Sequence, residues 1–253
     1  MQIAVIMKLV PDVVEELVLS DEGTHLERGD TVLKANEFDE QALEQALLLK
    51  EAGAGEVTVI AAETGDVDEV LYTALAKGAA RAIKLVGDGL AEGIANAQYA
   101  QVLAPLLIDL KPDLVLCGVQ ANDDLDGQLT TWLAAKLGWP FATVVAGVEV
   151  TGERVQVRKE FAGGRSARLS LSAPAILGIQ AAPEPPRYAP ISRVRQVMKT
   201  QSLEEREVEV DGASLSVLAM VAPVRSGGAE LIEGDIAAKA ERLVAILQER
   251  GII

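Results

Sequence analysis

Cysteine and histidine are almost absent, with one of each in 253 residues. A single cysteine excludes a disulfide within the chain. Cys117 falls inside an apolar run, where a buried and inert thiol is the expected state. His25 lies in a polar stretch that is typical of a loop or hairpin tip. One histidine cannot build a histidine-rich metal site and makes a Ser-His-Asp triad a poor interpretation, so hydrolase chemistry is not expected.

Positive charge is also scarce, with 23 Lys and Arg against 38 Asp and Glu and a net charge of −15. Nucleic acids and anionic membranes are bound by positive fields, so neither is an expected partner. No apolar run approaches the roughly 20 residues that span a bilayer. The first residues lack the basic-then-apolar order of a secretion signal. We therefore expect a soluble, cytoplasmic protein without membrane insertion.

What the sequence does contain is a regular alternation of apolar runs and helical patterns. Runs of strand length occupy residues 2–8, 56–62, 82–86 and 114–117, and helical patterns occupy residues 36–53, 66–78, 94–110 and 128–137. Asn36 and Asp39 have the spacing of a capping box at the first helix. This alternation predicts an α/β fold with a doubly wound, mostly parallel sheet of the Rossmann-like, adenine-nucleotide-binding kind.

The pattern changes after Pro140. Residues 143–150, 154–161 and 166–171 read as β-strands separated by turn sequences, and residues 175–179 as a further strand. They predict an antiparallel edge to the sheet.

A cluster of prolines marks a second boundary, because four of the ten fall between Pro183 and Pro190. Such a segment is stiff and extended. The end of the chain, from Asp235 to Gly251, has the pattern of a capped amphipathic helix. We divide the chain into an α/β nucleotide-binding core, residues 1–182, and a segment of residues 183–253. The second segment holds the Pro-rich loop, an extended C-terminal arm and a helix whose apolar stripe requires a partner chain.

The acidic loop GVQANDDLDGQ, residues 118–128, joins the fourth strand to a helix and admits several interpretations. As a calcium loop it lacks the glutamate expected at its last ligand position, which is Leu133. Paired carboxylates for acid/base work have no nearby nucleophile or histidine. A solvated turn whose aspartates cap the next helix is a further alternative.

The position of this loop favours a nucleotide. Ligands of open parallel sheets bind beyond the carboxyl ends of the strands, and the following helix offers N–H groups to a phosphate. Gly118 and Gly127 permit a close approach of the backbone. Carboxylates repel phosphate, so the aspartates are expected to face ribose hydroxyls or backbone amides. Neither common phosphate-loop motif is present, so the pattern alone does not decide.

Four motifs occur together and in a fixed order. They are Lys8-Leu9-Val10-Pro11-Asp12, Asn36-Glu37-Phe38-Asp39 with Ala42 and Glu44, the loop of residues 118–128, and Arg187-Tyr188. On these motifs the chain closely resembles the β subunit of electron transfer flavoprotein. The resemblance implies an electron-carrier subunit that is not an enzyme by itself. Such a subunit serves fatty acid oxidation, taking electrons from acyl-CoA dehydrogenases and related flavin dehydrogenases and passing them to a membrane quinone oxidoreductase.

The resemblance also implies a heterodimer, cofactors and site residues. The FAD is bound mainly by the α subunit, around which the arm wraps. This chain binds a structural AMP. No catalytic residue and no metal ligand is assigned. Partner recognition is assigned to Arg187, Tyr188 and Ile191, the last as an aliphatic anchor for a dehydrogenase. The AMP pocket is assigned to Ile6, Asn36, Glu37, Phe38, Asp39, Ala62, Gly118, Val119, Gln120, Ala121, Asn122, Asp123, Asp124, Leu125, Asp126, Gly127, Gln128 and Leu129.

The chain departs from the family's pattern at one place, and three alternative functions remain. After Gln128 the family has a small or β-branched residue and then glycine, whereas this chain has Leu129 and Thr130, whose hydroxyl is a substitute donor. An electron-bifurcating relative would hold a second FAD in the same site and use NADH as donor. A nucleotide hydrolase or ATP-binding stress protein and a calcium-regulated interaction module are the other classes.

Overall fold

The computed structural model describes residues 1–27, 29, 31–90, 93–124, 127–152, 154–210, 217–223, 227–229 and 231–253. These residues divide into two compact units, Met1–Leu218 and Ala219–Ile253.

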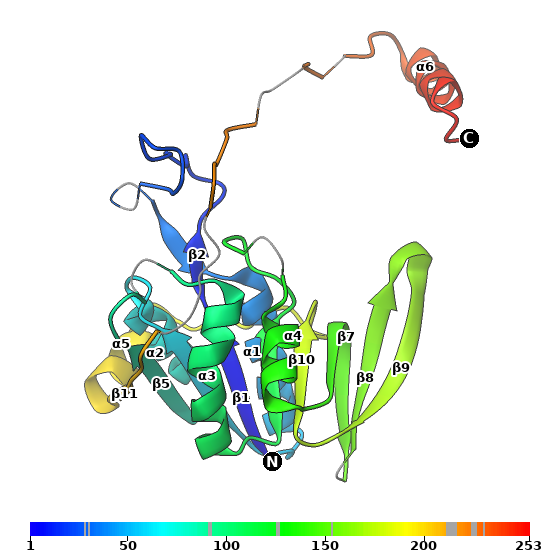
Figure 1. Ribbon diagram of the computed structural model, residues 1–253. Helices are drawn as coiled ribbons and strands as arrows, with labels where there is room; N and C mark the ends of the chain where they lie inside the picture. Colours follow the sequence, from blue (N-terminus) through cyan, green and yellow to red (C-terminus); the bar gives the residue numbers. More distant parts are fainter. Residues whose placement is uncertain are drawn as a thin grey trace. The chain divides into compact units, whose positions relative to one another are not determined.

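A nine-stranded sheet forms the centre of the first unit (Figure 1), in the order β11-β5-β4-β1-β6-β10-β7-β8-β9. Neighbours pair in parallel from β11 to β7, and β7, β8 and β9 pair antiparallel. The central strands are buried on both faces, as their unbroken apolar runs predict. The bounds are β1 Gln2–Met7, β4 Glu56–Ala62, β5 Arg81–Val86, β6 Leu114–Gly118, β7 Phe141–Thr151, β8 Arg154–Phe161, β9 Arg165–Ser172, β10 Ala175–Ile179 and β11 Glu204–Glu207.

Helices cover both faces of this sheet (Figure 1). One apolar core lies under α1, Glu37–Glu51, and α2, Val67–Lys77. The other lies under α3, Asn96–Leu110, and α4, Leu129–Leu137. The prediction of a doubly wound, mostly parallel sheet with an antiparallel edge is therefore confirmed. A separate two-stranded sheet, β2 Leu9–Pro11 with β3 Leu33–Ala35, extends from the carboxyl end of β1.

The strand predicted at residues 175–179 has a more central place than an edge strand. β10 lies between β6 and β7 and is parallel to both. Its five residues are buried. It therefore joins the parallel part of the sheet to the antiparallel edge.

The capping box predicted at the start of α1 does not form. Asn36 is the N-cap, as expected, but its side chain makes no cap hydrogen bond. Its amide group donates instead to the carbonyl oxygen of Gln120 at 2.9 Å. The Asp39 carboxylate accepts backbone N–H groups from the ends of β1 and β6. Partners far away in the sequence therefore take the place of the expected backbone cap, and the Asn36 and Asp39 side chains also hydrogen-bond to each other.

The segment after Pro183 contains two elements that the sequence patterns did not indicate. They are a helix, α5 Ile191–Thr200, and the edge strand β11, which pairs in parallel with β5. β11 has the sequence EERE, and a strand made of four charged residues gives no apolar signal. Residues 183–210 thus belong to the first compact unit.

The second unit contains α6, Ile236–Glu249, which was predicted from its apolar stripe. The Asp235 carboxylate caps it by accepting the Ala238 N–H at 2.9 Å, which confirms the predicted cap. Ile236, Leu243 and Val244 are exposed.

Candidate functional site

The carboxyl ends of β1, β4 and β6 lie at one edge of the sheet because the three strands are parallel neighbours. The predicted loop begins at this edge, directly after Gly118 at the end of β6. A hollow of only about 20 Å³ lies among these ends and the start of α3. It is lined by Met7, Lys8, Ala62, Thr64, Gly93, Ile94, Tyr99 and Asp123.

Asp39 holds two of these strand ends together. Its side chain, in the first turn of α1, is buried, with 4% of the residue exposed. One carboxylate oxygen accepts the Gly118 N–H at 2.7 Å and the other accepts the Lys8 N–H at 2.9 Å. A single carboxylate therefore fixes the exit of β1 relative to the exit of β6.

Burial raises the pKa of the Asp39 carboxyl to about 7. The loss of hydration raises this pKa by more than its other neighbours lower it. Those neighbours are the two backbone N–H groups, the Lys8 charge and the Asn36 side chain. Gly118 is required beside this carboxyl group. A methyl group on Gly118 would lie 2.5 Å from the nearer Asp39 oxygen and 2.7 Å from Cβ of Phe38.

Two further contacts hold the loop in place. The Asn36 amide reaches the Gln120 carbonyl, as described above, and the Val119 N–H donates to the Ile179 carbonyl on β10 at 2.9 Å. At the far end of the loop, the Asp124 carboxylate accepts the Gly127 N–H at 2.9 Å. Gly127 has a φ of 57°, a conformation that favours glycine. The Asp124 carboxylate thus provides the acceptor for the Gly127 N–H.

Lys8 brings the only positive charge to the lining of the small hollow, as far as the described residues go. Its ammonium group lies 2.7 Å from an Asp123 oxygen and 4.0 Å from an Asp124 oxygen. The Lys8 side chain is 12% exposed. Lys8 occurs in the first of the four sequence motifs but was assigned no role there, although a lysine directly after a buried strand in an acidic chain is a usable signal.

The residues predicted for the nucleotide gather at this edge of the sheet but differ in exposure. Leu125 and Asp126 lie outside the described residues. The buried ones are Ile6, Asn36, Asp39, Ala62, Gly118, Ala121 and Leu129. Those exposed or partly exposed are Glu37, Phe38, Val119, Gln120, Asn122, Asp123, Asp124, Gly127 and Gln128.

The expected substitute donor, Thr130, points elsewhere. Its side chain is 1% exposed and its hydroxyl bonds to the Cys117 thiol. A methyl group on Gly178 of β10 would lie 2.9 Å from that hydroxyl oxygen. Cys117 is buried, as predicted, and burial raises the pKa of its thiol, which disfavours the reactive thiolate. The Thr130 hydroxyl belongs to the core and does not face the loop.

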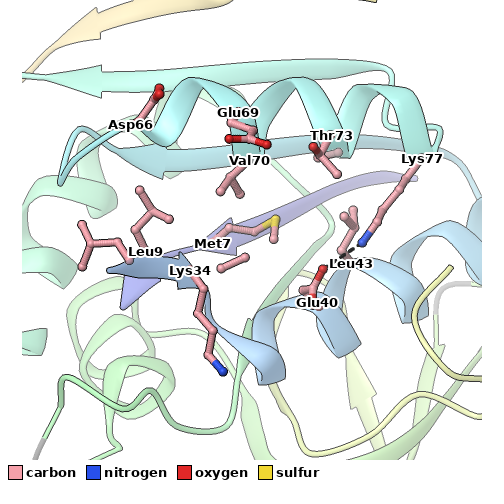
Figure 2. Close-up of a pocket in the computed structure, with 13 residues that line it drawn as sticks. Met7, Leu9, Lys34, Glu40, Leu43, Asp66, Glu69, Val70, Thr73 and Lys77 are labelled. Atoms are coloured by element: carbon pink, nitrogen blue, oxygen red, sulfur yellow. Dashed lines mark hydrogen bonds and ion pairs between the residues drawn. The ribbon is translucent and has the colours of Figure 1, made fainter. Parts of the chain in front are cut away.

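A larger cavity, of about 310 Å³, lies away from the predicted loop, between α1, α2 and the β2–β3 sheet. Figure 2 shows apolar side chains such as Met7, Leu9 and Val70 along its inner wall and Glu69 near its edge. Lys77 and Glu40 form an ion pair of 2.9 Å at one end. None of the residues predicted for the nucleotide lines this cavity. We therefore place the candidate site at the strand ends, where the loop is anchored.

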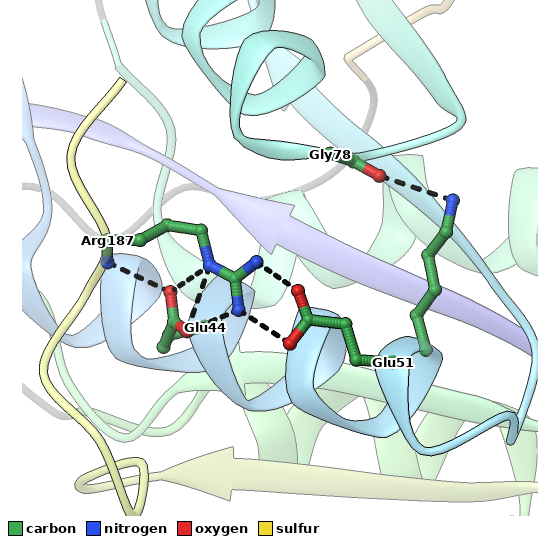
Figure 3. Close-up of polar contacts among 5 residues, drawn as sticks. Glu44, Glu51, Gly78 and Arg187 are labelled. Carbon is green, nitrogen blue, oxygen red and sulfur yellow. Dashed lines mark hydrogen bonds and ion pairs between the residues drawn. The ribbon is translucent and has the colours of Figure 1, made fainter. Parts of the chain in front are cut away.

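The three residues predicted for partner recognition have different environments. Arg187 is bound within the chain: its guanidinium group contacts the carboxylates of Glu44 and Glu51 on α1 (Figure 3). The Arg187 N–H also donates to Glu44, whose side chain is only 3% exposed. Arg187 thus fastens the Pro-rich loop to α1. Tyr188 and Ile191 are 79% and 62% exposed and remain available to a partner.

Two absences concern the described part of the chain. No helix there is both long and apolar enough to cross a membrane. No three His, Cys, Asp or Glu side chains in the same ranges are grouped to hold a metal ion, and Asp126 falls outside those ranges.

The doubly wound sheet, with a loop tied across its central strand ends, defines a Rossmann-like α/β domain. Comparison with known proteins is more specific. The electron transfer flavoprotein domain family matches residues 24–213. Electron transfer flavoprotein subunit beta of Methylophilus methylotrophus is 30% identical over 98% of both chains. The human protein of the same name is 31% identical over 100% of this chain and 99% of its own. That of Bradyrhizobium diazoefficiens is 34% identical over 81% of each. The chain belongs to the electron transfer flavoprotein β-subunit family.

Proposed function

We propose that this chain is the β subunit of a heterodimeric electron transfer flavoprotein. In this role it carries no catalytic residue of its own. It joins an α subunit, with which it encloses FAD, and holds a structural AMP at the carboxyl ends of β1, β4 and β6. The complex carries electrons from acyl-CoA dehydrogenases and related flavin dehydrogenases to a membrane quinone oxidoreductase. The bound FAD supplies the electron chemistry, and the cytoplasm is the proposed location.

The observation that carries the nucleotide part of this proposal is the anchoring of the loop at the strand ends. The backbone of Gly118 is held by Asp39, and that of Gln120 by Asn36. A loop that is fixed by its backbone, with a helix beginning at Leu129 behind it, suits a phosphate. The chemistry of these residues therefore fits an adenine nucleotide. In this assignment Asp39 and Asn36 support the loop, and the loop faces the ligand.

The aspartates, which seemed unsuited to a phosphate, are compatible with it. Asp124 accepts the Gly127 N–H, and Asp123 is paired with Lys8. The repulsion that these two carboxylates would exert on a phosphate is thus reduced by partners within the chain.

The recognition part rests on the segment that follows the Pro-rich loop. Arg187 fastens this segment to α1, so Tyr188 and Ile191 are presented from a fixed base. α5 adds Arg193, Arg195 and Lys199, which are exposed. An exposed apolar anchor beside basic residues suits a partner with an apolar pocket and an acidic rim. We assign this surface to the dehydrogenases.

The nucleotide content of the purified complex tests the proposal. The chain is co-expressed with its α subunit, the complex is denatured, and the released nucleotides are identified and counted by mass spectrometry. One FAD and one AMP per complex is the expected result. Two FAD and no AMP would assign the chain to the electron-bifurcating branch with NADH as donor. FAD alone would contradict a nucleotide site in this chain.

A further inference from the structure

The backbone of Lys8 is fixed by the start of α1, and the end of its side chain is paired with the loop. Its N–H donates to Asp39, and its carbonyl oxygen accepts the Asn36 N–H at 3.0 Å. The ammonium group contacts Asp123, which is on the predicted loop. The backbone of Lys8 is therefore fixed at the end of β1, and its flexible side chain is the part that can change partners.

The hollow beside Lys8 is too small for a nucleotide as it stands. Its volume is about 20 Å³, close to that of one water molecule, whereas sites for small molecules start at roughly 300 Å³. Lys8 and Asp123 both line this hollow, and their side chains meet in an ion pair. A nucleotide can enter between β1 and the loop only if this pair separates.

The charges around the hollow also indicate that the Lys8–Asp123 pair must be exchanged when a phosphate binds. A phosphate monoester carries about −1.5 to −2 charges at pH 7. The carboxylates of Asp123 and Asp124 lie beside the same Lys8 ammonium group, at 2.7 Å and 4.0 Å. Separating the pair without replacing it would leave a carboxylate and a phosphate side by side. Lys8 is the cation within reach in the described lining, and its ammonium can neutralise either group.

We propose that Lys8 is the residue that admits the phosphate of the nucleotide, by exchanging its Asp123 partner for a phosphate oxygen. Asp123 then turns toward solvent, and the hollow opens between the end of β1 and the loop. Lys8 in this way selects ligands that carry a phosphate over the free nucleoside. This inference rests on the proposed function, since it concerns the same nucleotide site.

The test uses the co-expressed α–β complex and two probes, AMP and adenosine. Equilibrium dialysis with isotope-labelled AMP gives the AMP affinity, and displacement by adenosine gives the affinity for the nucleoside. Lys8→Met keeps the apolar stem and removes the charge. We expect it to weaken AMP by about 10- to 100-fold, the range of a charge-assisted hydrogen bond, and to leave adenosine within about twofold.

Three further variants separate a role in binding from a role in folding. Lys8→Arg keeps the charge and is expected to recover most of the AMP affinity. Asp123→Asn removes the competing carboxylate and is expected to tighten AMP several-fold. Lys50→Met is the matched control, because Lys50, in the last turn of α1, pairs with Glu56 and does not line the small hollow. Its AMP affinity should equal that of the unmodified complex.

The outcomes are distinguishable. Equal losses of AMP and adenosine in Lys8→Met, without recovery in Lys8→Arg, would mean that Lys8 only supports the fold and would overturn the inference. Unchanged AMP affinity in both Lys8→Met and Asp123→Asn would overturn it as well. In these cases the unmodified complex still binds AMP and the proposed function stands. An unmodified complex that binds neither probe would instead overturn the proposed nucleotide site itself.

Discussion

Replacing Asp39 by asparagine tests whether this side chain ties the ends of β1 and β6 together. The asparagine oxygen can accept one of the two backbone N–H groups, from Gly118 or Lys8. Its NH₂ group then faces the other N–H, which loses its acceptor in a buried place. An unsatisfied buried donor costs about 1–3 kcal/mol. We expect Asp39→Asn to lower the free energy of unfolding by about this amount at pH 5, where the folded Asp39 carboxyl is protonated and both side chains are neutral.

The pH dependence makes the prediction sharper. The folded-state pKa of Asp39, about 7, lies above its ordinary value of 3.8. The folded chain therefore binds this proton more tightly than the unfolded chain. The resulting stability is fully present below pH 3.8 and is lost as the pH rises through about 7. Each pH unit within this window is worth about 1.4 kcal/mol, so the unmodified chain gains about 3 kcal/mol from this group between pH 8 and pH 5. Asp39→Asn cannot gain it.

The measurement is urea unfolding of both proteins at pH 5 and pH 8, followed by tryptophan fluorescence and circular dichroism. The unmodified protein should be more stable than the variant by about 1–3 kcal/mol at pH 5, and this advantage should fall by about 3 kcal/mol, to zero or below, at pH 8. Glu37→Gln is the control, because Glu37 is an exposed carboxylate in the same turn of α1. A difference that is the same at both pH values would show that Asp39 stays ionised and that burial does not control its pKa. A variant as stable as the unmodified chain at pH 5 would refute the tie between the strands.

Four other changes have definite expected outcomes. Gly118→Ala places a methyl group 2.5 Å from an Asp39 oxygen, so urea unfolding should show a loss of about 1–3 kcal/mol. Gly147→Ala is its control, with the nearest atom at 3.7 Å, and should change stability little. Arg187→Met leaves the buried Glu44 carboxylate without its guanidinium partner and should cost about 3–5 kcal/mol, with faster proteolysis of the Pro-rich loop; equal proteolysis rates would contradict its anchoring role. Ile191→Ala should slow electron transfer from a dehydrogenase without altering nucleotide content, and unaltered kinetics with every dehydrogenase tested would remove its recognition role. Truncation after Leu218, the boundary of the first unit, should leave a folded domain that no longer co-purifies with α.

The sheet was predictable because its central strands carry their signal locally. The runs of β1, β4 and β6 are apolar at nearly every position, as burial on both faces requires. The opposite holds for β11, whose four residues are all charged and which forms because β5 offers an open edge. Arg81 of β5 contacts Glu204 of β11 at 2.6 Å. A contact of this kind depends on which strands are neighbours, and no pattern within residues 204–207 contains that information.

The candidate site also has one feature that the sequence predicted and one that it did not. Position in the fold was enough to place the loop at the strand ends, because the carboxyl ends of parallel strands share one edge of a sheet. The partners of Asn36 and Asp39 were not predictable. The sequence offers both as a local capping pair, whereas their real partners, Gln120 and Gly118, lie about 80 residues away along the chain. These long-range partners satisfy backbone groups at the ends of β1 and β6 and in the loop, which is where buried polar groups need a hydrogen bond.

The acidity of the loop is consistent with its proposed ligand because its aspartates have separate tasks. Asp124 shapes the backbone by accepting the Gly127 N–H, and a carboxylate that accepts a backbone donor has part of its charge compensated. Asp123 is held by Lys8, whose own backbone is fixed by Asp39. A chain of contacts thus runs from α1 through the end of β1 to the loop. A phosphate arriving at this edge competes with one carboxylate for one ammonium group, so affinity is set by that exchange more than by the number of acidic residues in the loop.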